Sequence, residues 1–60
     1  MDLDLAIKDY TEAIRIDPED VYSLLKRGDA YAKKGDQDRA IEDLNEAIRI
    51  DPNYVFAYSS

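Results

Sequence analysis

Residues 36–52 read DQDRAIEDLNEAIRIDP, and residues 2–18 read DLDLAIKDYTEAIRIDP. The two stretches lie 34 positions apart, and the similarity extends over residues 2–26 and 36–60, where 13 of 25 aligned pairs are identical. A repeat of this length is typical of stacked helix–turn–helix units, because each unit needs a neighbour to bury its apolar face. The period therefore predicts an all-α fold of antiparallel helical hairpins and a function in binding.

Both copies show the apolar spacing of a helix with one buried face. The first copy predicts a helix over residues 2–17, with these apolar residues three and four positions apart: Leu3, Ala6, Ile7, Tyr10, Ala13 and Ile14. The second copy predicts a helix over residues 36–51, whose inward-facing residues are Ala40, Ile41, Leu44, Ala47 and Ile48. Asp2 and Asp36 are the expected N-terminal caps. Each helix ends at an Asp-Pro step, because a residue before proline is pushed out of the α region.

A further helix is expected between the copies, over residues 21–34. One of three acids in the preceding loop caps its start: Asp17, Glu19 or Asp20. Gly35 supplies the left-handed position after the last turn. The expected buried stripe of this helix consists of Leu24, Gly28 and Tyr31. Gly28 in mid-helix costs about 1 kcal/mol relative to Ala, so we expect another helix to approach it closely.

The composition restricts the function classes. The chain has 60 residues, near the lower limit for a domain that folds alone, and contains neither Cys nor His. Thiol nucleophiles, zinc sites and the commonest general base are therefore excluded. A net charge of −6 disfavours nucleic acid and anionic membranes as partners. No apolar run is long enough to cross a membrane, and the acidic start is unlike a signal peptide, so we expect a cytoplasmic protein.

Carboxylates lie close together at several places in the sequence. Each of these clusters can be explained without metal binding or catalysis. The acids of residues 17–20 and 36–38 lack the spacing of a calcium loop, and helix capping explains both groups. Glu42 and Glu46 share a helix face, but no apolar pocket is expected there to raise a pKa for catalysis. We therefore expect no enzyme activity, no metal and no cofactor.

The small and aromatic residues of this period resemble the tetratricopeptide repeat, a helical hairpin of the same length. The matching residues of the central repeat are Leu24, Gly28, Tyr31, Gly35, Ala40, Leu44, Ala47 and Pro52. Those of the first half-repeat are Ala6, Tyr10, Ala13 and Pro18. The resemblance implies a single domain over residues 1–60, part of an α-solenoid with a right-handed superhelix. Its parts are the second helix of a truncated repeat (residues 1–20), a complete repeat (21–54) and the start of a third (55–60).

In this family the first helix of each hairpin, helix A, lines a groove that binds peptides or partner helices. The resemblance implies a protein-interaction module or scaffold whose groove candidates are Tyr22, Leu25, Lys26, Asp29, Lys33 and Phe56. An ordinary solvated face of mixed charge remains the alternative for this helix surface. Asp29 would repel a peptide carboxylate, and the net charge of −6 favours a basic or apolar peptide.

Self-association is the competing hypothesis. In this family a preceding helix A covers the face that the first helix is expected to expose, and the C-terminal end carries several aromatic residues in a stretch too short for a stable helix alone. The self-association candidates are Leu3, Ala6, Tyr10, Ala13, Tyr54, Phe56 and Tyr58. Large apolar patches usually mark contacts, so we expect a homo-oligomer, either head-to-tail or swapped across Gly35, or part of a longer repeat array.

Overall fold

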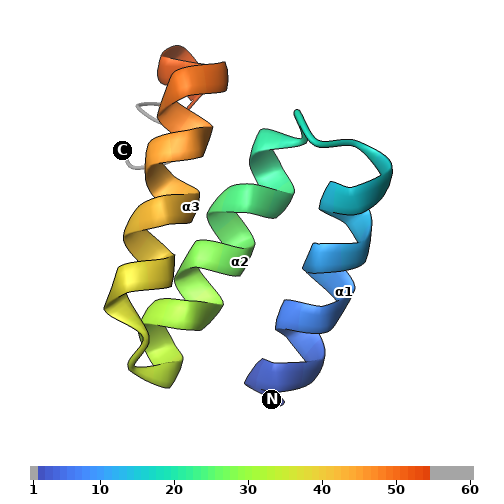
Figure 1. Ribbon diagram of the computed structural model, residues 1–60, viewed down its shortest axis with the longest axis vertical. Coiled ribbons are helices and arrows are strands. Elements are labelled where there is room, and N and C mark those ends of the chain that lie inside the picture. Colours follow the sequence, from blue (N-terminus) through green and yellow to red (C-terminus); the bar gives the residue numbers. More distant parts are fainter. Residues whose placement is uncertain (1, 55–60) are drawn as a thin grey trace.

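The computed structural model describes residues 2–54, which form three α-helices. They are α1 (Leu3–Ile16), α2 (Val21–Lys34) and α3 (Gln37–Ile50). Figure 1 shows α2 between the other two helices, with neighbouring helices antiparallel, and α2 packs against both. No strand occurs in the described part of the chain. The all-α prediction and the helical hairpins are therefore confirmed, whereas the predicted start of a third repeat at residues 55–60 lies outside the described residues.

Each helix begins one residue after an aspartate that caps it. The side chains of Asp2, Asp20 and Asp36 accept hydrogen bonds from backbone N–H groups three residues later, at 3.2, 3.3 and 3.2 Å. These bonds satisfy donors that the first turn of a helix otherwise leaves without a partner. The structure confirms the predicted caps of the outer helices and selects Asp20 among the three acids expected before α2.

The helix ends also follow local signals. At Asp17 and Asp51 the backbone leaves the helical conformation, and each residue's N–H still donates to the carbonyl of an alanine four positions earlier. Gly35 has a φ of 97°, the left-handed conformation that favours glycine, and its N–H and that of the next residue donate to the last turn of α2. Helical structure resumes at residues 52–54, where the Asp51 carboxylate accepts from the Tyr54 N–H at 3.1 Å.

The apolar core lies mainly on α2. Its buried members are Val21, Leu24, Leu25 and Ala47, and Ile14, Ile50 and Tyr54 pack against them half-buried. The prediction for α3 was wrong for three of its five inward-facing residues. Ile41, Leu44 and Ile48 are 53%, 41% and 42% exposed, because α2 covers only one side of the apolar stripe of α3. Tyr31, expected in the buried stripe of α2, is only half-buried.

The close approach predicted at Gly28 is present. A Cβ atom there would lie 3.3 Å from both the Ala40 carbonyl oxygen and the Asp43 Cβ. Glycine therefore lets the backbones of α2 and α3 meet at this point.

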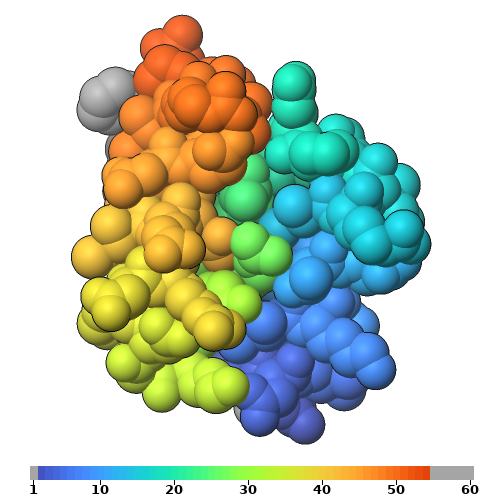
Figure 2. All heavy atoms as spheres, viewed as in Figure 1, coloured from blue at the N-terminus to red at the C-terminus, as the bar shows by residue number. Residues whose placement is uncertain are grey.

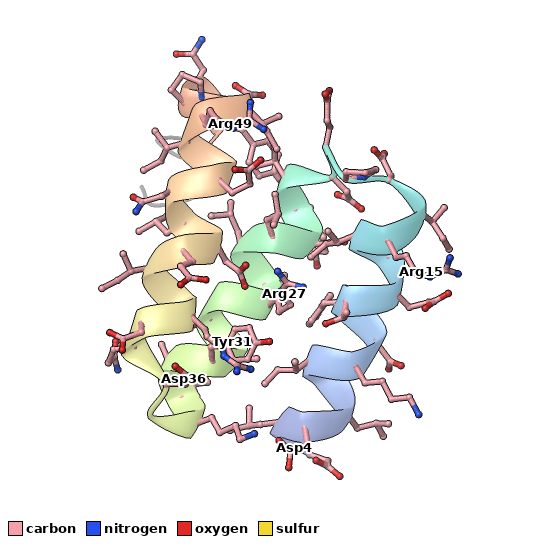
Figure 3. The ribbon with its side chains drawn as sticks, in the orientation of Figure 1. Asp4, Arg15, Arg27, Tyr31, Asp36 and Arg49 are labelled. Atoms are coloured by element: carbon pink, nitrogen blue, oxygen red, sulfur yellow. The ribbon has the colours of Figure 1, made fainter. Side chains whose placement is uncertain are left out.

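A buried ion pair joins the same two helices. Arg27 of α2 donates from Nε and Nη2 to the two carboxylate oxygens of Asp43 on α3, at 2.8 and 2.6 Å. Its Nη1 donates to the Thr11 hydroxyl of α1 at 3.3 Å, so one guanidinium contacts all three helices. Figure 3 shows Arg27 near the middle of the molecule and Tyr31 one turn further along α2. Our sequence analysis did not predict this pair.

Candidate interaction surfaces

The first candidate surface is an open groove between α2 and α3 with a volume of about 300 Å³. We call it the α2–α3 groove. Its lining residues are Leu25, Gly28, Asp29, Ala32, Gln37, Ala40, Ile41 and Leu44. The helix–helix contact at Gly28 forms part of its wall, and the small side chains of Ala32 and Ala40 leave space between the helices. The exposed parts of Ile41 and Leu44 make its α3 side apolar. Such a surface suits the apolar face of a helix or peptide.

Four of the predicted groove candidates form a stripe along α2. Tyr22 is 49% exposed, and the Lys26 Nζ lies 5.8 Å from the centroid of its ring. Lys33 and Asp29 form an ion pair at 3.1 Å one turn further along the helix. We call these four residues the α2 stripe. It joins the α2–α3 groove at Asp29.

The structure places the remaining groove candidates elsewhere. Leu25 is only 7% exposed, so it belongs to the core and contributes little more than an edge to the α2–α3 groove. Phe56 lies outside the described residues. Sequence analysis missed the contribution of α3, whose exposed Ile41 and Leu44 had been assigned to the interior.

A second hollow, of about 290 Å³, lies on α1. We call it the α1 hollow, and its lining consists of Asp2, Leu5, Ala6, Asp9 and Tyr10. Leu5 is 56% exposed, and no residue of α1 is fully buried. The first helix is therefore held less firmly than α2.

The self-association candidates are distributed over two places. On α1 the structure leaves four of them half-buried: Leu3, Ala6, Tyr10 and Ala13. Tyr54 packs against the core of its own chain. Phe56 and Tyr58 lie outside the described residues. The structure therefore brings only the α1 candidates together on one helix surface.

Most cations of the described residues are engaged within the chain. Hydrogen bonds from Arg15 lower the pKa of Glu12 below its ordinary value of 4.5, and Arg49 does the same to Glu46. Figure 3 shows Arg15 on the side of α1 that points away from α2, and Arg49 near the C-terminal end of α3. Lys34 pairs with Asp4 at 2.5 Å, which raises the lysine pKa and joins the end of α2 to the start of α1.

The Arg27–Asp43 pair is less exposed than these surface pairs. The side chains are 19% and 7% exposed, and hydrogen bonding to Asp43 raises the pKa of Arg27 above its ordinary range. In Figure 2 atoms of α2, in green, fill the space between α1 and α3 on the face where this arginine lies. The pair therefore lies at the junction of the helices, with only a small part of the guanidinium in contact with solvent.

Two kinds of site are absent from the part of the chain described. Residues 2–54 contain no group of three or more side chains that could hold a metal ion. No helix among them is long and apolar enough to span a membrane.

Comparison with protein families agrees with the helical hairpins. A tetratricopeptide repeat model matches residues 2–55. The chain therefore belongs to the tetratricopeptide repeat family, whose members generally mediate protein–protein interactions through a non-catalytic fold. Searches of curated proteins and of solved structures gave no match.

Proposed function

We propose that this chain is a protein-interaction module that binds a peptide or partner helix along α2. The apolar face of the partner packs into the α2–α3 groove, and its polar groups meet the α2 stripe. The observation that carries the proposal is the open groove whose α3 side is formed by the exposed Ile41 and Leu44, with the exposed Ile48 one turn after Leu44. Single exposed apolar residues are common on proteins, but a contiguous set next to a groove usually marks a contact.

The energetic gain from covering this surface is modest and sufficient for a transient complex. Full burial of a Leu or Ile side chain contributes about 1.5–3 kcal/mol, and these three are roughly half exposed already. A helix that covers them therefore gains about 1 kcal/mol from each side chain. Contacts in the rest of the α2–α3 groove add to this gain, and the ordering of the partner opposes it.

The proposal is tested by measuring the affinity of the chain for fluorescent amphipathic peptides of about 15 residues, a length that can form a helix. Leu44→Glu puts a charge in the α2–α3 groove and should weaken binding by at least tenfold, since one buried unpaired charge costs more than 1.4 kcal/mol. Ile16→Glu is the matched control, because Ile16 is 73% exposed on α1 and does not line the groove. Equal effects of the two substitutions would contradict the groove assignment.

The α2 stripe is tested separately by reversing its charges. Lys26→Glu and Asp29→Lys should change the preference between basic and acidic versions of the same peptide in opposite directions. Far-ultraviolet circular dichroism checks that both variants remain helical. If both variants bind every peptide as the unchanged chain does, the stripe takes no part in recognition.

A second candidate function is self-association through α1, favoured by the exposed Leu5 and the α1 hollow. It would make the chain a homo-oligomer or a unit of a longer array with a right-handed superhelix, in a cytoplasmic setting. The charge of −6 on each copy opposes this association. Sedimentation equilibrium over a wide concentration range tests it: Tyr10→Glu should return an oligomer to monomers, and a chain that is monomeric throughout rules it out.

A further inference from the structure

We draw no further inference here: the strongest candidate, the side-chain cluster at the junction of the helices in which the guanidinium groups of Arg27 and Arg39 flank the ring of Tyr31, carries none, because each guanidinium is already paired with an aspartate of this chain and nothing in the described residues 2–54 points to a ligand there.

Discussion

Removing one partner of the Arg27–Asp43 pair should destabilise this protein far more than removing both. Arg27→Met leaves a carboxylate that is 7% exposed without its partner, and an unpaired buried charge of this kind costs about 3–5 kcal/mol. Asp43→Leu leaves an arginine that is 19% exposed and can turn towards water, so we expect about 1–3 kcal/mol. A chain of 60 residues has a total stability of about 3–9 kcal/mol. Arg27→Met alone therefore removes much of it.

The double variant Arg27→Met/Asp43→Leu removes both charges, and its Leu keeps the branched shape of the aspartate while being larger. Exchange of a buried ion pair for apolar residues is often neutral or stabilising, so we expect the double variant to lie within about 1 kcal/mol of the unchanged chain. The coupling free energy is then about 3 kcal/mol or more in favour of the pair. Near the transition, 1 kcal/mol corresponds to roughly 8 °C in Tm for a chain of this size.

Thermal and urea unfolding, followed by far-ultraviolet circular dichroism, measure the stability of the unchanged chain, the two single variants and the double variant. Added salt should reduce the contribution of the Arg27–Asp43 pair to stability less than that of a surface pair, because a buried pair is screened less than an exposed one. The Lys34–Asp4 pair, with side chains 49% and 73% exposed, provides the comparison. Our reasoning is refuted if the double variant is as unstable as Arg27→Met, since the loss would then come from packing alone.

Three smaller effects follow from the helix ends and the surface pairs. Gly35→Ala should cost about 1–2 kcal/mol in unfolding free energy, because φ is 97° there. Gly28→Ala gains about 1 kcal/mol of helix propensity, but the added Cβ lies 3.3 Å from the Ala40 carbonyl oxygen and such overpacking costs about 1–3 kcal/mol, so we expect a net destabilisation of about 1 kcal/mol in the same assay. Glu12 and Glu46 have pKa values lowered from 4.5, so their stabilisation is present above pH 4.5 and is lost as the pH falls through the folded-state values. The loss of unfolding free energy as the pH falls below 4.5 should therefore be smaller for Glu12→Gln/Glu46→Gln, which is already less stable at neutral pH, than for the unchanged chain.

The ends of the helices could be predicted from the sequence because their causes are local. An Asp cap acts on an N–H three residues away, a proline acts on the residue before it, and Gly35 adopts its φ without help from distant contacts. The predicted limits of α2 agree with the structure, and those of α1 and α3 differ by a single residue at each end. Gly28 was also informative, because a mid-helix glycine is unfavourable unless a neighbour approaches.

The errors concern contacts between residues far apart in the chain. Periodicity shows that Ile41 and Ile48 share an apolar face, but it does not show how much of that face α2 covers. Arg27 and Asp43 are 16 positions apart, and their pairing depends on how two helices are aligned. A signal was nevertheless present: the Asp9/Asp43 position is acidic in both copies, next to apolar neighbours on the same helix face.

The Arg27–Asp43 pair connects stability to recognition. It lies next to the Gly28 contact, so it fixes how α2 sits on α3 and therefore the width of the α2–α3 groove. Two apolar side chains at these positions can preserve stability, but they lack the directional bonds that set one alignment of the helices. The double variant therefore separates the two roles. If the double variant is as stable as the unchanged chain but binds groove peptides more weakly, the ion pair is needed for the shape of the α2–α3 groove. If it binds them equally well, the Gly28 contact alone determines that shape.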